Sequence, residues 1–166
     1  TLRYFNVAGS DPAGRIGQST PNATLLTKVA CEAAVGKRDH VSIYGTDYPT
    51  PDGTGVRDYI HVEDLASAHL KALEYLRGGG ESTTLNCGYG HGYSVREVLD
   101  KVGEVAGCPL NIKETGRRPG DPPTLIARAD KVRDVLGWEP RYDDLTAIVS
   151  SSLNWERKLA AGVWSD

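Results

Sequence analysis

Apolar residues recur along this chain at two spacings, and their alternation predicts the fold class. Short apolar runs typical of strands occupy Leu2–Val7, Val41–Tyr44, Tyr59–Val62, Thr83–Cys87 and Leu110–Glu114. Between them, apolar residues return every three or four positions, as in amphipathic helices, at about residues 20–36, 63–77, 94–106, 130–136 and 145–160. Strands that alternate with helices predict an α/β fold with mainly parallel strand pairing.

Turn and capping residues mark the ends of these elements. Thr20 followed by Pro21 predicts a helix start, and Gly36 predicts the end of that helix. Ser94 and Glu97 predict a capping box at the start of another helix. Because strands this short do not build a full doubly wound sheet, we expect the last strands of a parallel sheet with a smaller lobe attached.

Composition narrows the functional classes. The chain has 166 residues and a net charge of −3, so we expect one domain and no binding to nucleic acid through an overall positive charge. No apolar stretch approaches the roughly 18 residues of a membrane helix. The cysteines Cys31, Cys87 and Cys108 are odd in number and far apart, which predicts a reducing, cytoplasmic setting without disulfides or a zinc site. The chain opens at Thr1 and contains no methionine, so we expect a fragment.

A loop rich in proline, glycine and aspartate precedes the first candidate ligand-binding residue. The run Gly45–Gly55 predicts an irregular, exposed loop, whose glycines allow the backbone to approach a ligand closely. Arg57 follows it, and a guanidinium can form two parallel charge-assisted hydrogen bonds with phosphate. The alternative is a surface salt bridge between Arg57 and Asp58 or Glu63.

Two further polar segments suit phosphate and sugar groups. Arg117 and Arg118 precede a Pro-Gly turn, so they could hold a diphosphate from the opposite side, and Asp121 could accept hydrogen bonds from sugar hydroxyls. The alternative is a solvated turn. Asn6 ends the first strand, at the edge where open α/β sheets bind ligands, and its amide suits hexose hydroxyls. The alternative there is an asparagine in a turn.

The glycine loop and the histidines have structural interpretations. Gly88–Gly92 lies between a strand and a helix, but Tyr93 stands where a dinucleotide fingerprint needs its third glycine, so we interpret the loop as a turn. His61, His69 and His91 show no metal-ligand spacing, so we expect no metal and place His61 in or beside the core.

One catalytic pattern is missing from the sequence. A tyrosine four residues before a lysine on one helix face lets the ammonium lower the phenol pKa for proton transfer. The lysines are Lys28, Lys37, Lys71, Lys101, Lys113, Lys131 and Lys158. None has a tyrosine four positions earlier, so the chain is expected to bind a substrate without carrying its own catalytic pair.

Motifs spread over most of the chain carry a family resemblance. They are LRYFNVAG (Leu2–Gly9), GTDYPTPDGTGVRDYIHVEDLA (Gly45–Ala66), LNCGYGHGYSV (Leu85–Val95) and RRPGD (Arg117–Asp121). With them, the chain resembles the C-terminal half of the UDP-glucose 4-epimerase family, in the extended short-chain dehydrogenase/reductase superfamily. The resemblance implies that residues 1–166 are the substrate-binding portion of an extended Rossmann-like, NAD-dependent epimerase, whose N-terminal half carries the NAD loop and the catalytic residues.

The resemblance also implies roles for individual residues, none of them catalytic. Tyr4 would lie near the nicotinamide of NAD. Arg57 and Arg118 would bind the diphosphate, and Asp121 would face the ribose. The implied uracil contacts are Ser42, Ile43 and Tyr44, and the remaining implied substrate contacts are Asn6, Leu26, Tyr59 and Leu125.

Two positions depart from the family pattern. Leu25 stands where the family usually has asparagine or histidine, which leaves the amide of Leu26 as the phosphate contact there. Leu125 stands where the family has tyrosine or a smaller residue beside the hexose. From its intermediate volume we hypothesise partial tolerance of an N-acetyl group.

The implied reaction interconverts UDP-galactose and UDP-glucose. NAD takes hydride from C4, the 4-keto sugar rotates, and hydride returns to the other face. We expect the isolated chain to be inactive and to need the missing N-terminal half, or a partner chain that carries it, and the intact enzyme to be a homodimer. The alternatives are another NAD-dependent nucleotide-sugar epimerase, and a non-enzymatic module that binds UDP-sugars or pairs with a partner.

Overall fold

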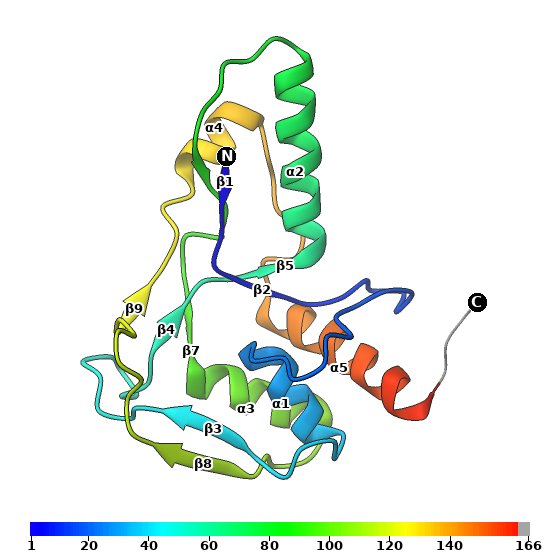
Figure 1. The fold of residues 1–166 in the computed structure, drawn as a ribbon, viewed down its shortest axis with the longest axis vertical. Coiled ribbons are helices and arrows are strands. Elements are labelled where there is room, and N and C mark those ends of the chain that lie inside the picture. Colours follow the sequence, from blue (N-terminus) through cyan, green and yellow to red (C-terminus); the bar gives the residue numbers. More distant parts are fainter. Residues whose placement is uncertain (163–166) are drawn as a thin grey trace.

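The computed structural model describes residues 1–162, whose elements form an upper and a lower group in the view of Figure 1. In the upper group, β1 (Leu2–Arg3) and β6 (Leu85–Asn86) form a parallel pair. Helices α2 (Val62–Arg77) and α4 (Asp130–Leu136) accompany this pair, and α4 packs against both α2 and β6. The upper group is therefore a small piece of α/β sheet with two helices beside it.

The lower group packs helices against a second parallel pair (Figure 1). The strands of this pair are β3 (Val41–Tyr44) and β8 (Ile112–Thr115). The helices are α1 (Leu26–Ala34), α3 (Val95–Ala106) and α5 (Leu145–Ala161), which pack against one another. This group is a lobe of three helices with its own parallel pair of strands.

Short strands join the two groups. β2 (Asn6–Ala8) pairs in parallel with β5 (Tyr59–His61) across the middle of the molecule. Next to it, β4 (Val56–Arg57) pairs in parallel with β9 (Thr124–Leu125) and antiparallel with β7 (Tyr93–Ser94). The α/β class with mainly parallel pairing is confirmed, although the strands form several small sheets.

Some predicted boundaries are confirmed and others are wrong. α4 and β3 have the predicted bounds, and the capping box between Ser94 and Glu97 is present. The predicted helix start at Thr20 is wrong. Asn22 has a left-handed φ of +55°, which interrupts a helix, and α1 begins only after Leu25.

Two other expectations need correction. The predicted strand Leu2–Val7 is divided into β1 and β2, with Tyr4 and Phe5 between them outside any strand pairing. The loop Gly45–Gly55 is irregular as predicted, but it is not exposed throughout. Tyr48 and Thr54 are buried, because the loop folds back onto the lobe.

The core runs through both groups. Its largest fully buried side chains include Trp138, Ile43, Ile60, Leu99 and Ile148. Within residues 1–162, no helix is both long enough and apolar enough to cross a membrane.

Candidate binding site

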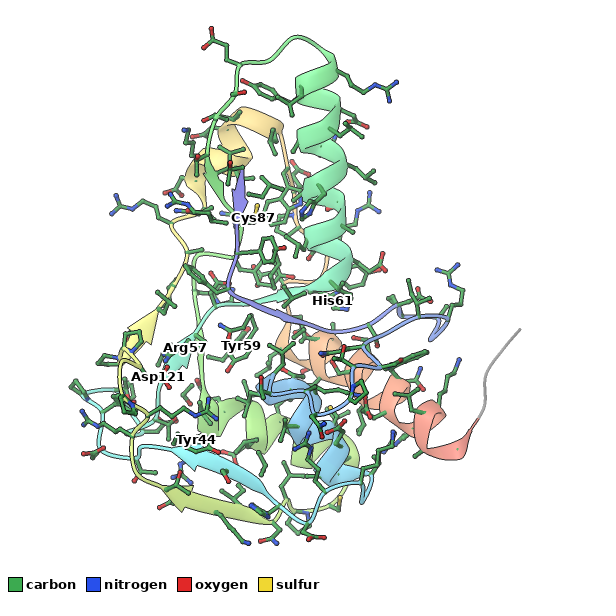
Figure 2. All side chains as sticks on the ribbon, viewed as in Figure 1. Tyr44, Arg57, Tyr59, His61, Cys87 and Asp121 are labelled. Atoms are coloured by element: carbon green, nitrogen blue, oxygen red, sulfur yellow. The ribbon has the colours of Figure 1, made fainter. Side chains whose placement is uncertain are left out.

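A cavity of about 610 Å³ opens between the lower lobe and the strands that join the two groups. Its size lies in the range typical of small-molecule sites. Of the predicted substrate contacts, those that line it are Asn6, Leu26, Ser42, Tyr44, Arg57, Tyr59, Arg118 and Asp121. Figure 2 shows Tyr44, Arg57, Tyr59 and Asp121 around this region, although they come from distant segments. The fold therefore brings most of the predicted site residues together.

Strand alternation places Arg57 and Tyr59 on the cavity wall. They flank Asp58, and successive side chains in an extended chain point to opposite sides. The carboxylate of Asp58 accepts hydrogen bonds from the backbone N–H groups of Tyr89 (3.1 Å), Gly90 (3.2 Å) and Ala127 (3.2 Å). Because this buried carboxylate is held from three sides, the backbone on either side of it is fixed.

Arg57 reaches along the wall toward Asp121. Its Nη2 lies 3.7 Å from Oδ1 of Asp121, and its Nη1 donates to the carbonyl of Val56 (2.8 Å). Only 15% of the Arg57 side chain is exposed. The alternative salt bridges with Asp58 or Glu63 are not formed in the described residues. Arg57 thus presents its guanidinium to the cavity with the Asp121 carboxylate beside it as a counter-charge.

Arg118 lines the same cavity. Its guanidinium carbon lies 3.6 Å from the centre of the Tyr44 ring, a cation–π contact. Through hydrogen bonding and its positive charge, Arg118 lowers the pKa of the Tyr44 phenol below its ordinary value. With Arg57, it makes this part of the cavity suitable for an anion that bears several oxygens.

Burial and strand pairing hold the neighbouring polar groups in place. Asn6 pairs in register with Tyr59, and its Nδ2 donates to the carbonyl of Asp58 (3.2 Å). The Tyr59 ring is almost fully buried, and burial raises the pKa of its phenol. Asn6 is therefore not a free turn residue, because its side chain is tied to the wall strand.

Three predicted contacts lie differently from the rest. The Ile43 side chain points into the core, so only its backbone is available to a ligand. Leu125 pairs in register with Arg57 but does not line the cavity. Tyr4 is exposed outside the cavity, and its ring makes an edge contact with His69 at 6.0 Å between centroids.

The structure adds Tyr48, which the sequence analysis missed. Its ring is 6% exposed and lines the cavity, and its Oη is the buried side-chain polar atom that has no hydrogen-bond partner within residues 1–162. An unpaired buried hydroxyl costs about 1–3 kcal/mol. Its place in the motif run Gly45–Ala66 was a signal, but nothing in its spacing indicated burial. Other lining residues not singled out from the sequence include Lys37, Arg38 and His40.

The glycine loop Gly88–Gly92 behaves as a structural turn. Two of its backbone N–H groups already donate to Asp58, and Ser94 caps the following helix. The loop therefore does not offer these amides to a phosphate group, which supports its interpretation as a turn.

His61 is a core residue, as expected (Figure 2). Its Nδ1 accepts a hydrogen bond from the backbone N–H of Glu63 (3.1 Å), and its Nε2 contacts the Ser151 hydroxyl (3.1 Å). The ring stacks on Tyr142, with 4.4 Å between centroids. Burial lowers the pKa of His61, so the ring is held neutral. Within the described part of the chain, no group of histidine, cysteine and acidic residues is arranged to hold a metal ion.

Comparison with known proteins identifies the relatives of this chain. Residues 1–88 match the family model described as the NAD dependent epimerase/dehydratase family. The UDP-glucose 4-epimerase of Azospirillum brasilense is 59% identical over 98% of this chain and 47% of its own length. That of Rhizobium meliloti (strain 1021) is 52% identical over 97% of this chain and 49% of its own length. The chain thus spans about half the length of the curated relatives it matches.

Solved structures give the same picture. UDP-glucose 4-epimerase from Bifidobacterium longum, in complex with NAD⁺ and UDP, superimposes with a TM-score of 0.88 at 40% identity, over 98% of this chain and 48% of that one. The UDP-Glc/GlcNAc 4-epimerase from Campylobacter jejuni gives a TM-score of 0.79 at 51% identity, over 95% and 47%. The chain is therefore homologous to UDP-glucose 4-epimerases over about half of their length.

Proposed function

Because the chain belongs to the NAD-dependent epimerase/dehydratase family, we propose that it is the UDP-sugar-binding, C-terminal half of a UDP-glucose 4-epimerase. The observation that carries this proposal is the cavity itself. Arg57 and Arg118 reach it from segments about sixty residues apart, together with polar groups suited to a nucleoside. Diphosphate recognition by paired guanidinium groups is the chemistry that this arrangement supports best.

NAD does not fit the described residues as a complete site. The amides of the glycine loop are bonded to Asp58, and the sequence contains no tyrosine–lysine pair at the spacing of four. Tyr4, exposed beside β1, is the one residue we assign to NAD. We therefore propose that the cofactor and the redox chemistry at the sugar belong to the missing half or to a partner chain, and that the assembled enzyme is a homodimer.

Within this division, the chain anchors the nucleotide. Arg57 and Arg118 hold the diphosphate, and Asp121, which already pairs with Arg57, faces the ribose. Ser42, Tyr44 and the backbone of Ile43 contact the base. Asn6, Tyr59 and the amide of Leu26 complete the wall. Charged groups concentrate on the nucleotide side, which leaves the hexose loosely held and free to rotate.

Calorimetric titration with UDP tests the anchoring role. Each charged hydrogen bond contributes roughly 1.5–3 kcal/mol, so Arg57→Ala and Arg118→Ala should each weaken UDP binding by about 10- to 150-fold. Arg96→Ala is the matched control, because Arg96 pairs with Glu114 on the surface outside the cavity. Unchanged UDP affinity in both cavity variants would refute the proposed function.

The choice of sugar is a finer part of the proposal. Leu125 lies on β9, the strand beside β4, where it pairs in register with Arg57. Its side chain is half-buried. We expect its intermediate volume to admit an N-acetyl group partly. In an intact enzyme, Leu125→Tyr should reduce turnover of UDP-GlcNAc more than turnover of UDP-glucose. Equal turnover of UDP-GlcNAc by both forms would rule out this role.

An activity assay separates binding from catalysis. The 166-residue chain alone should not interconvert UDP-galactose and UDP-glucose, whereas a mixture with a separate N-terminal half should. Conversion by the isolated chain would contradict the assignment of the catalytic residues to another segment.

A further inference from the structure

The two consecutive arginines have different surroundings. Arg118 lines the cavity, whereas Arg117 does not. Arg117 instead donates from Nε to Oδ1 of Asp47 (2.7 Å) and from Nη2 to the Asp47 carbonyl. Its guanidinium carbon also lies 4.3 Å from the centre of the Tyr48 ring. Arg117 therefore grips the loop 45–55 by a forked hydrogen bond and a cation–π contact.

A glycine makes this close approach possible. Gly45 has a φ of +88°, and a Cβ on it would lie 2.7 Å from Cγ of Arg117 and 2.7 Å from Cε2 of Tyr48. The backbone N–H of Gly45 also donates to the carbonyl of Thr115 (2.9 Å). The segment that carries both arginines is thus packed directly onto the loop.

Two other contacts tie the turn 117–121 to the lobe, and both involve groups of the proposed ligand site. They are the ion pair of Asp121 with Arg57 and the stacking of Arg118 on Tyr44. A bound diphosphate would engage Arg57 and Arg118 and loosen both ties. The contact between Arg117 and Asp47 lies outside the cavity, so it can persist when the ligand is present.

We propose that Arg117 is a positioning residue, which with Asp47 and the Tyr48 ring forms a clamp that holds Arg118 in place for a nucleoside diphosphate. This inference rests on the proposed function. The Asp47 side chain is 75% exposed and that of Arg117 is 44% exposed. Such an exposed ion pair adds little to global stability. The effect we assign to it is instead the placement of Arg118.

Asp47→Asn gives the sharpest test, because the loss of a negative charge and the loss of Arg118 positioning should change UDP affinity in opposite directions. Removal of a carboxylate near an anion site should by itself strengthen UDP binding. Asn keeps an acceptor oxygen but loses the charge that strengthens the bond from Arg117, so the clamp loosens, and we expect UDP affinity in the 166-residue chain to fall about three- to tenfold. Glu114→Gln is the matched control. It removes an exposed carboxylate from β8, where Glu114 pairs with Arg96 and does not contact Arg117, and it should leave UDP affinity unchanged or slightly higher.

A double-mutant cycle shows whether the effect passes through Arg118. In an Arg118→Ala background, Asp47→Asn should change UDP affinity less than about twofold, because no guanidinium remains to be positioned. The thermal midpoints of the ligand-free variants should stay close to that of the parent chain. A reduced affinity together with a folded, unaltered ligand-free state would separate positioning from loss of structure.

The outcomes distinguish this inference from the proposed function. If Arg118→Ala weakens UDP binding but Asp47→Asn strengthens it or leaves it unchanged, the clamp is refuted and the proposed function stands. An equal loss from Asp47→Asn in both backgrounds would also refute positioning through Arg118. If the parent chain does not bind UDP, both proposals fall.

Discussion

The cavity wall and the outer face of α2 differ in how far contacts within the chain pair their polar groups or cover their apolar side chains. In the wall, Asp58 has three backbone donors, and Arg57 and Arg118 have partners within the cavity. On α2, by contrast, Leu70 is 64% exposed and Leu73 is 51% exposed. Apart from the Tyr48 hydroxyl, these polar groups of the wall find partners inside the chain, whereas the apolar side chains on the outer face of α2 stay exposed.

The helix pattern explains the difference. Leu65 and Ala68 bury one face of α2, while Val62, Leu70 and Leu73 make the opposite face apolar as well. Charged residues occupy other positions of α2, so these side chains form a second apolar stripe, which is typical of a surface that another element covers. β1 also pairs only with β6 among the described strands. The binding wall is thus closer to complete within this chain than the helix surface beside β1 and β6.

The largest expected effect tests the completeness of the wall. Asp58→Ala should lower the free energy of unfolding by about 3–5 kcal/mol, because it leaves three backbone N–H groups, two of them buried, without an acceptor. Urea denaturation followed by circular dichroism measures this. Asp39→Ala, at an exposed position, is the control and should cost under about 0.5 kcal/mol. A loss below 1 kcal/mol for Asp58→Ala would contradict the role assigned to this carboxylate.

Acidification tests His61, which lies where β5 meets α2. Burial lowers its pKa in the folded state, so below pH about 6.5 the unfolded chain binds a proton that the folded chain does not. The free energy of unfolding should therefore be flat above that pH and fall by roughly 1 kcal/mol per pH unit below it. A His69→Gln variant, changed at an exposed ring, should keep this slope, and His61→Gln should reduce it. A slope that is identical in all three proteins would exclude His61 as its source.

A smaller effect with the opposite sign is expected at Tyr48. Tyr48→Phe removes a buried hydroxyl that has no described partner and keeps the ring under Arg117. The free energy of unfolding should rise by about 0.5–1 kcal/mol. Calorimetric melting measures the change. Destabilisation would show that the hydroxyl is satisfied in solution.

The smallest effect on stability is expected on the outer face of α2. Leu70→Gln with Leu73→Gln should change the free energy of unfolding by less than about 0.5 kcal/mol, since both side chains are already exposed. Self-association, measured by light scattering over a range of concentrations, should decrease. A parent chain that is already monodisperse and monomeric would count against this expectation.

Local signals predicted the parts of the fold that depend on neighbours in sequence. The capping box at Ser94 and the bounds of α4 need only residues within one or two helical turns, and both are correct. The start of α1 was mispredicted from Thr20 because the left-handed Asn22 prevents the helix from beginning there. Such a conformation is set by tertiary packing as well as by the residue itself.

By itself, the sequence determined the alternation of strands and helices and the family motifs, and through them eight of the residues that line the cavity. Only the tertiary structure decided that Arg57 pairs with Asp121, that Ile43 faces the core and that Arg117 grips Asp47 while Arg118 faces the ligand site. Local spacing reports which residues share one face of an element. The distance between segments sixty or seventy residues apart depends on how those faces pack against one another in the tertiary structure.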